Sequence, residues 1–396
     1  MGISRKAAGI QPSATLAISA KARQLKAQGV DVIGFGAGEP DFDTPEHIKA
    51  AAKRALDEGF TKYTPAAGIP ELRQELARQY SQAHNREYSP NQVVVSCGGK
   101  HALYNIFQAI CDPGDEVIFA APYWVSYIEM VRLADAKPVV LPTTAEENFT
   151  LTPEAIREAL TDRTKAIILN SPSNPTGTMY SRAQLEAIAE LALERNVYVV
   201  ADEIYDRLVY DGEPFVSIAT LREGMERITL IVNAVSKTYS MTGWRVGWVL
   251  APEEIARAIG NIQSHSTSNP TSFAQKAALA AITGPQDCVE EMRRAFEERR
   301  NVICRLLDEI PGVRYARPQG AFYVFPDLSS YYGRTLGGRE IRDSLSLTEY
   351  LLDTVQVAVV PGEAFGEDRC IRLSFATSME NIQRGLERIR KALAEG

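Results

Sequence analysis

Short apolar segments rich in valine and isoleucine alternate with helical patterns through the middle of the chain, and this alternation limits the possible folds most strongly. The predicted strands are residues 93–96, 116–119, 138–141, 165–169, 197–201, 228–232 and 246–250. Helical patterns at residues 101–110 and 183–195 lie between some of them. Such alternation is typical of an α/β fold, in which helices cover both faces of a mostly parallel sheet.

The two ends of the chain have a different pattern from its middle. A helix is predicted over residues 13–28, with Ser13 as its cap, and Thr44 is expected to cap a later helix that has Pro45 in its first turn. Beyond residue 285 the predicted elements are a charged helix at 288–307, strands at 313–316, 321–325, 357–360 and 371–375, a polar loop at 329–345 and a last helix. We therefore expect three parts: an N-terminal segment packing with the small domain (1–45), a large domain (46–285) and a smaller α+β domain (286–396).

Polar, aromatic and glycine residues gather where the predicted strands of the large domain end. They are Gly99, Trp124, Asn174, Asp202 and Lys237. In open α/β sheets, ligands bind outside the carboxyl ends of the strands. The sequence therefore predicts a small-molecule site at this edge of the sheet.

Lys237 indicates what chemistry that site performs. Burial and nearby cations lower the pKa of a lysine, and the resulting neutral amine condenses with an aldehyde to give a Schiff base. Ser236 and Arg245 are suited to a phosphate, the arginine through its bidentate fork. An aldehyde that carries a phosphate describes pyridoxal phosphate. Taken alone, an ordinary surface lysine beside an arginine explains these three residues equally well.

Other residues at the strand ends fit the same ligand. Gly98-Gly99-Lys100 opens a helix whose free N–H groups favour a phosphate. Asp202 ends an apolar strand, and a buried carboxylate needs a partner such as a pyridinium N–H. Arg372 alternates out of an apolar strand and needs an anion, which is either a substrate carboxylate or a structural salt bridge. Trp124 either stacks on a flat ring or belongs to the core.

Several classes of protein are disfavoured by composition. The net charge of −7 and the lack of Lys/Arg-rich runs argue against a nucleic-acid partner. No stretch of about 20 apolar residues is present to span a bilayer, and the N-terminus lacks the apolar region of a secretory signal. The five cysteines are scattered, and the four histidines lack metal-ligand spacing. We expect a cytoplasmic protein with no membrane, nucleic-acid or metal partner.

Seven motifs carry a resemblance to a known family. They are Ala37-Gly-Glu-Pro-Asp-Phe, Tyr63-Thr-Pro-Ala-Ala-Gly, Pro122-Tyr-Trp, Asn170-Ser-Pro-Ser-Asn-Pro-Thr-Gly, Asp202-Glu-Ile-Tyr, Ser236-Lys-Thr-Tyr-Ser-Met-Thr-Gly-Trp-Arg and Ile371-Arg-Leu-Ser-Phe-Ala. Over essentially its whole length the chain resembles the fold-type I, class I pyridoxal-phosphate aminotransferases. It looks most similar to the bacterial and plastid aspartate aminotransferases, some of which also use prephenate.

The resemblance implies how the cofactor is held. Lys237 would form the Schiff base and move the substrate proton, while Asp202 would hold the pyridine nitrogen. The ring would be contacted by Trp124 through stacking and by Asn174 and Tyr205 through hydrogen bonds to its oxygen. The phosphate would be bound by Ser236, Arg245 and the amides of Gly99 and Lys100. Tyr63 would reach the phosphate in the neighbouring subunit, which implies a homodimer with shared active sites.

The resemblance also implies the substrates. Arg372 would bind the α-carboxylate, with Asn174 and the backbone of Gly38 assisting. In the aspartate/prephenate subgroup, a lysine matching Lys100 and a threonine matching Thr15 are associated with the second carboxylate of the substrate. Animal-type relatives place an arginine for that carboxylate in the segment matching residues 263–270, and the absence of an arginine there supports this role for Lys100. The alternative is that Lys100 only neutralises phosphate.

We therefore expect transamination between L-aspartate and 2-oxoglutarate, giving oxaloacetate and L-glutamate, with prephenate to arogenate as a further reaction. The small-molecule partners are amino acids and 2-oxo acids. An aminotransferase of broader or aromatic specificity, or a lyase using the same cofactor, is the alternative. A ligand-sensing regulator would need a fused DNA-binding module, which we do not expect in residues 1–12. A nicotinamide dehydrogenase would need a G-x-G-x-x-G motif after a strand, and none is present.

Overall fold

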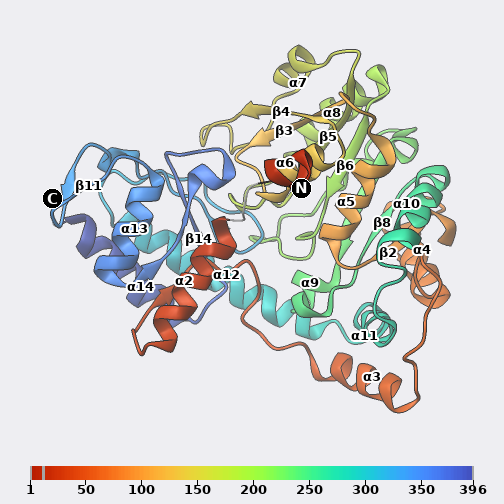
Figure 1. Ribbon diagram of the computed structural model, residues 1–396, viewed down its shortest axis with the longest axis horizontal. Helices are drawn as coiled ribbons and strands as arrows, with labels where there is room; N and C mark the ends of the chain where they lie inside the picture. The colour runs from red at the N-terminus through yellow and green to blue at the C-terminus, as the bar shows by residue number, and fades with distance from the viewer. Residues whose placement is uncertain (1, 11–13, 395–396) are drawn as a thin grey trace.

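The computed structural model describes residues 2–10 and 14–394, and its large domain is built on a seven-stranded sheet (Figure 1). The sheet order is β2-β8-β7-β6-β5-β3-β4. The strands are β2 (Val93–Ser96), β3 (Glu116–Ala121), β4 (Lys137–Pro142), β5 (Thr164–Asn170), β6 (Tyr198–Asp202), β7 (Thr229–Ala234) and β8 (Gly247–Leu250). All neighbours pair in parallel except β8, which is antiparallel to both β2 and β7. The predicted α/β fold with a mostly parallel sheet is confirmed.

Helices cover both faces of this sheet, and the alternation of side chains along each strand explains why. In β6, Val199 and Ala201 face one core layer, which includes Ile188 of helix α8, whereas Val200 faces the other layer, which includes Phe107 of helix α5. Successive side chains of a strand point to opposite faces, so a strand buried on both faces is apolar throughout. The helices of this domain are α3 (Glu46–Asp57), α4 (Pro70–His84), α5 (Gly99–Ile110), α6 (Ser126–Leu133), α7 (Pro153–Ala159), α8 (Arg182–Arg195), α9 (Val235–Thr238), α10 (Glu253–Ser266) and α11 (Ser272–Thr283).

The C-terminal region packs three helices around a small antiparallel sheet. The helices are α12 (Asp287–Asp308), α13 (Ser344–Val355) and α14 (Met379–Ala394), and the sheet order is β13 (Val360–Pro361), β14 (Ile371–Ser374) and β9 (Tyr323–Val324). The loop predicted at 329–345 contains a short hairpin, β10 (Thr335–Leu336) with β11 (Arg339–Glu340).

Three of the predicted strands in this region need correction. The strand predicted at 313–316 is wrong, because the segment makes a single β-bridge, Arg314 with Asp327, and no continuous ladder. The Tyr315 side chain contacts α12, where its hydroxyl donates to Asp308 at 2.7 Å. The strand at 357–360 is two elements, because β12 (Val357–Ala358) and β13 pair with different partners. The strand at 321–325 shortens to β9, since Ala321 has a left-handed φ of 56°.

Within the N-terminal segment, helix α2 (Ala14–Ala27) and strand β1 (Ile33–Gly34) lie against the C-terminal region, whereas the first helix contacts the large domain, where Lys6 donates to Asp135 at 2.8 Å (Figure 1). Strand β1 pairs in parallel with β12, and helix α2 places Ala22 in a cluster with Leu352 and Ala358. Helix α1 (Arg5–Gly9) precedes α2, and the expected cap Ser13 lies outside the described residues. The division of the chain at residues 45 and 285 stays a prediction.

The cap expected at Thr44 is wrong. Pro45 is the N-cap residue of α3 and no side chain caps this helix. The Thr44 hydroxyl donates to the backbone oxygen of Ser240 at 2.7 Å and accepts from Trp244 Nε1 at 3.0 Å. Thr44 therefore fastens the loop after Lys237 rather than the start of a helix.

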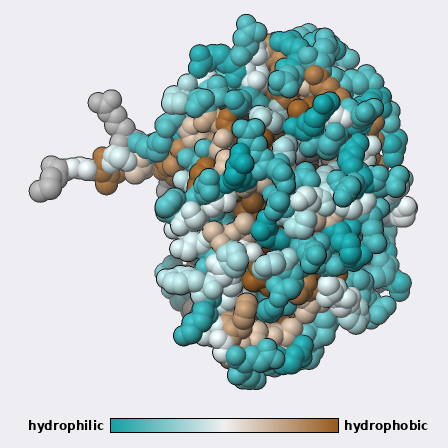
Figure 2. Space-filling view, turned by 90° about the vertical axis from the view of Figure 1, so that its right-hand side faces the viewer, coloured by the Kyte–Doolittle hydropathy of each residue, from teal (hydrophilic) through white to brown (hydrophobic). Residues whose placement is uncertain are grey.

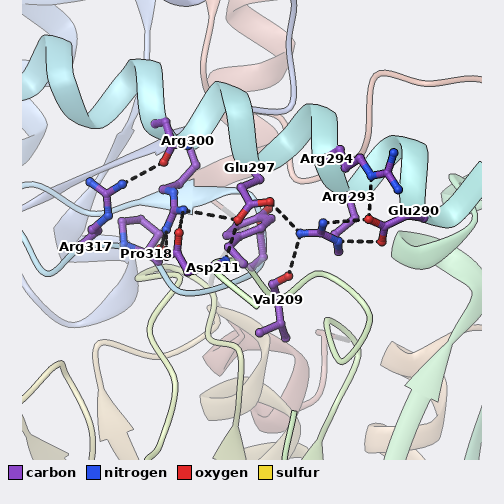
Figure 3. A network of polar contacts seen from close by, with 12 residues as sticks. Val209, Asp211, Glu290, Arg293, Arg294, Glu297, Arg300, Arg317 and Pro318 are labelled. Atoms are coloured by element: carbon purple, nitrogen blue, oxygen red, sulfur yellow. Dashed lines mark hydrogen bonds and ion pairs between the residues drawn. The ribbon is translucent and has the colours of Figure 1, made fainter. Parts of the chain in front are cut away.

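Helix α12 connects the two regions through a polar network (Figure 3). Arg300, fully buried on α12, makes a bidentate ion pair with Asp211 and donates to the backbone oxygen of Pro318. Elsewhere the visible surface is largely hydrophilic, with smaller apolar areas (Figure 2). Among the described residues, no helix combines the length and the hydropathy needed to cross a membrane.

Candidate active site

The strand ends of the large domain open onto a cavity of about 600 Å³ that also borders the N-terminal segment and β14. Nine residues predicted for the site line this one cavity: Gly38, Gly99, Lys100, Trp124, Asn174, Asp202, Tyr205, Lys237 and Arg372. They come from segments that are far apart in the sequence. The fold therefore brings together most of the residues that the strand-end pattern singled out.

Lys237 reaches the cavity from α9, a single helical turn that begins directly after β7. Its Nζ donates to the backbone oxygen of Gly38 and lies 5.8 Å from the centroid of the Phe322 ring. Burial lowers the pKa of Lys237 to about 8, against the opposing attraction of the Glu39 carboxylate. A large fraction of this side chain is thus a neutral amine at mildly alkaline pH.

Asp202 ends β6 with its carboxylate buried beneath the cavity. The hydroxyl of Tyr127, on α6, donates to Asp202 Oδ2 at 2.5 Å, and the backbone N–H of Ile204 donates to Oδ1 at 3.4 Å. Burial raises the pKa of Asp202 to about 6, while the Tyr127 hydrogen bond and the charge of Lys237 oppose that rise. The side chain is mostly ionised at neutral pH and can hold a cationic N–H group.

Arg372 is a buried cation with no carboxylate beside it. It is 2% exposed and donates from Nη1 to Asn174 Oδ1 at 3.0 Å and from Nη2 to the backbone oxygen of Gly36 at 2.9 Å. Its Nε has no hydrogen-bond partner, and no ion pair to it occurs within residues 2–10 and 14–394. Burial lowers the pKa of Arg372, and its guanidinium lies 4.6 Å from the Tyr323 ring centroid. A buried, unpaired guanidinium facing a cavity is suited to a carboxylate from a ligand.

Neutral polar side chains fix the position of these charged groups. The side chain of Asn170 accepts from the backbone N–H of Asn174 at 2.9 Å and donates to the backbone oxygen of Asp202 at 3.0 Å. The hydroxyls of Tyr205 and Tyr323 are hydrogen-bonded at 3.0 Å. Asn170 and Tyr323 therefore hold the loops that carry the predicted site residues.

The chain is closely packed around the start of α5. Gly98, its N-cap, has φ of +90°, and a Cβ there would lie 2.5 Å from Arg245 Nη2. A Cβ on Gly247 would clash with the backbone nitrogen of Gly99. Arg245 donates from Nη1 to the oxygen of Thr242 at 2.9 Å and remains exposed. Free N–H groups at a helix start beside an arginine suit a phosphate.

Lys100 and Trp124 form another wall of the cavity. The Lys100 ammonium lies 4.9 Å from the centroid of the Trp124 ring. Burial and the charge of Arg245 lower the pKa of Lys100. Trp124 in turn packs edge to face on Tyr127, with ring centroids 5.4 Å apart. Tyr127 therefore contacts both the Trp124 ring and the Asp202 carboxylate.

Three of the predicted residues, Tyr63, Ser236 and Arg245, do not line this cavity, and a fourth has a side chain that is not described. Tyr63 is 90% exposed and does not line the cavity of its own chain. Ser236 is buried beside Lys237, outside the cavity lining. Thr15 is part of α2, but its side chain lies outside the described residues.

Sequence reasoning missed Tyr127, Asn170, Tyr323 and Glu39. Asn170 carried a usable signal, since it directly follows a predicted strand as Asp202 does. Tyr127 and Tyr323 carried none, because only the folded chain places either hydroxyl beside its partner.

Taken together, the cavity matches a ligand with a phosphate, a cationic ring nitrogen and a carbonyl that reacts with an amine. The helix start at Gly98 and Gly99 would accommodate the phosphate, Asp202 the ring nitrogen and Lys237 the carbonyl. The residues present therefore fit pyridoxal phosphate. Arg372 stays free for the carboxylate of a second molecule.

Comparison with known proteins agrees with this chemistry. Residues 30–389 match the family described as aminotransferase class I and II. An aspartate aminotransferase of Bacillus subtilis is 48% identical over 99% of this chain and 98% of its own length. A probable aspartate/prephenate aminotransferase of Aquifex aeolicus is 50% identical, with 100% and 99% covered. The structure of the Thermus thermophilus aspartate aminotransferase with maleate superposes with a TM-score of 0.93 at 46% identity, covering 99% of this chain and 100% of that chain.

Proposed function

The chain belongs to the class I and II aminotransferases, and we propose that it exchanges the amino group of L-aspartate with 2-oxoglutarate, giving oxaloacetate and L-glutamate. We propose prephenate, which would yield arogenate, as a further amino acceptor. Relatives similar along their whole length carry both activities in their names, which supports each assignment.

Pyridoxal phosphate is the proposed cofactor. When bound, it supplies an aldehyde that takes up and returns the amino group and a ring that withdraws electrons. Asp202 would keep the ring nitrogen protonated, and the sharing of its charge with Tyr127 keeps that carboxylate ionised at neutral pH. Ser236, Arg245 and the amides of Gly99 and Lys100 would hold the phosphate. Asn174 and Tyr205 would fix the ring oxygen, and Trp124 would cover one face of the ring.

The observation that carries the proposal is the unpaired, buried Arg372 in the same cavity as Lys237. A buried guanidinium is costly without an anion, and an amino-acid carboxylate provides one. Asn174 already holds one arm of the guanidinium at 3.0 Å, so the fork is oriented before substrate arrives. The backbone of Gly38 lies next to Lys237, because the Gly38 oxygen accepts a hydrogen bond from Lys237 Nζ. The substrate would thus be held with its α-carbon near the amine.

Lys237 would carry the proton between substrate and cofactor. A group transfers protons best when its pKa lies near the working pH, and burial brings the pKa of Lys237 to about 8. Removing the amine should therefore abolish turnover while leaving the carboxylate site intact.

The second carboxylate of the substrate would be met by Lys100, assisted by Thr15. Lys100 and Arg372 line the same cavity, which supports a joint role for the two cations in binding a dicarboxylic acid. The similar structure of the Thermus thermophilus aspartate aminotransferase contains maleate, which is a dicarboxylate, and this supports the choice of substrate class.

We further propose a homodimer in the cytoplasm. Tyr63 is 90% exposed in the isolated chain, and burial of its ring against the phosphate of a second subunit would account for a large aromatic residue at this position. All five cysteines are free thiols, in keeping with a reducing compartment.

The test is a titration of the purified holoenzyme, followed through the visible absorption of its cofactor. Aspartate or glutamate should bleach the band, and oxaloacetate or 2-oxoglutarate should restore it. Prephenate is then tried as the acceptor. Lys237→Ala should bind the dicarboxylates yet show no turnover. Release of ammonia or pyruvate from a single amino acid would instead indicate a lyase, and normal turnover by Lys237→Ala would refute the proposal.

A further inference from the structure

Two cations of helix α2 line the catalytic cavity. Arg23 and Lys26 are both exposed, and both border the same cavity as Arg372 and Lys237. Neither side chain makes a hydrogen bond or ion pair within the part of the chain that the structure describes. Unpaired basic side chains at the rim of a cavity are free to act on an incoming ligand.

The packing of α2 directs these two side chains. Ile18, Ala22 and Lys26 are spaced four residues apart and therefore follow one side of the helix, with Ala22 buried against Leu352 and Ala358. Arg23 lies beside them on the rim. Contacts of α2 with β12 and β13 hold the helix against the small domain; Figure 1 shows α2 in front of this domain.

A third basic residue on the same helix behaves differently. Lys21 pairs with Asp353 of α13 at 3.4 Å and does not border the cavity. Arg23 and Lys26 therefore border the cavity that contains Lys237, whereas Lys21 does not. This contrast separates a local role from a general effect of net charge.

The overall charge of the protein makes such a rim useful. The chain carries a net charge of −7 at pH 7, so its long-range field repels anions. The 2-oxo acids of the proposed reaction carry two negative charges, aspartate and glutamate carry one net negative charge, and alanine carries none. Local cations at the mouth of a cavity raise the capture rate of an anion by a factor whose logarithm grows with that charge.

We infer that Arg23 and Lys26 form a cationic entrance that favours dianionic acids over neutral amino acids. This inference rests on the proposed function, because it concerns the same cavity and the same substrates. The entrance acts on the approach of the substrate, whereas Lys100 and Arg372 would act on the bound molecule. Its effect is therefore on kcat/KM, graded by substrate charge and sensitive to salt.

The test compares the Arg23→Gln/Lys26→Gln double variant with the parent and with Lys21→Gln, which removes a charge of α2 that does not border the cavity. In low salt, kcat/KM of the double variant should fall about fivefold for 2-oxoglutarate, about twofold for aspartate and not at all for alanine. The differences should vanish near 0.5 M salt, where the screening length is only a few ångströms. Lys21→Gln should match the parent throughout. A loss that is equal for alanine, or that persists in high salt, would overturn the inference.

Binding of maleate to the holoenzyme, followed by stopped-flow absorbance, tests the entrance without turnover. The association rate constant of the double variant should be lower than that of the parent in low salt and equal to it in high salt. Equal association rates in low salt would overturn the inference. If the parent fails to transaminate these acids, the proposed function fails, while the maleate comparison still decides on the entrance.

Discussion

Replacing Asp211 by asparagine should lower the free energy of unfolding by about 2 kcal/mol, because the buried Arg300 would lose its hydrogen-bonded counter-ion and keep only the Glu297 carboxylate, 3.8 Å away. Figure 3 shows the arrangement on α12. Arg300 donates to Asp211 Oδ2 from Nη1 at 2.8 Å and to Oδ1 from Nη2 at 2.6 Å. Asparagine suits the substitution, since Asp211 has a left-handed φ of 59° that asparagine also tolerates.

The magnitude follows from what the substitution removes. Asparagine keeps one acceptor oxygen, so one charge-assisted hydrogen bond is lost, worth about 1.5–3 kcal/mol. Breaking a fully buried ion pair costs about 3–5 kcal/mol. The Arg300 side chain is 0% exposed but that of Asp211 is 53% exposed, so water screens part of the charge and the lower value applies. The remaining bond from Arg300 to the oxygen of Pro318, at 2.8 Å, limits the loss further.

A double-mutant cycle isolates the pair. Arg300→Met removes the buried charge while keeping most of the apolar stem, and the double variant Asp211→Asn/Arg300→Met removes both charges. The double variant should be more stable than the sum of the single losses predicts, with a coupling of about 1–2 kcal/mol. Urea unfolding followed by circular dichroism, with pyridoxal phosphate in excess, provides the values.

The pH dependence provides a further check. The Arg300 guanidinium lowers the pKa of Asp211, so this carboxylate stabilises the fold above its unfolded pKa of about 3.9 and loses that contribution as the pH falls through its folded pKa. The difference between parent and Asp211→Asn should therefore be constant from pH 5 to 8 and shrink below about pH 4. A single variant within 0.5 kcal/mol of the parent, or strictly additive losses, would refute the reasoning.

Four shorter predictions concern the cavity and its surroundings. Covalent capture of pyridoxal phosphate by the cofactor-free protein should quicken as the pH rises through about 8, because the neutral amine of Lys237 reacts; stopped-flow absorbance that is flat from pH 6.5 to 9 would contradict this. Tyr127→Phe should weaken cofactor binding about tenfold in equilibrium dialysis, as Asp202 loses the donor that favours its ionised form. Lys100→Met should reduce kcat/KM for aspartate about tenfold more than for alanine, and an equal loss would leave Lys100 as a phosphate contact. Glu203→Gln should become more stable relative to the parent as the pH rises from 6 to 8. Burial raises the pKa of Glu203 to about 8, so in this range the unfolded chain releases the Glu203 proton while the folded parent keeps it, and the parent loses stability. Urea midpoints of the two proteins that differ by the same amount at pH 6 and pH 8 would contradict this.

Much of the fold follows from the sequence because strand and helix periodicities are local. Each of the seven predicted strands of the large domain overlaps a strand of the sheet, and the polar residues at the ends of β5 and β6 and shortly after β7 were recognisable by position alone. The antiparallel direction of β8 was not recognisable, because an apolar run reads the same in both directions. The small domain was predicted less well, since its two-residue strands depend on partners such as β1 and β14 that lie far away in the chain.

The sequence by itself determined which chemical groups are available at the strand ends: an amine, a carboxylate, a guanidinium and a glycine-lined helix start. Only the tertiary structure decided their state. The hydroxyl on Asp202 comes from Tyr127, 75 residues earlier, and Arg372 lies 198 residues from Asn174 and 336 from Gly36. Burial sets the pKa of Lys237 and leaves Arg372 without an anion. Desolvation and charge–charge interactions depend on distances in space, which residue types and their spacing along the chain do not specify.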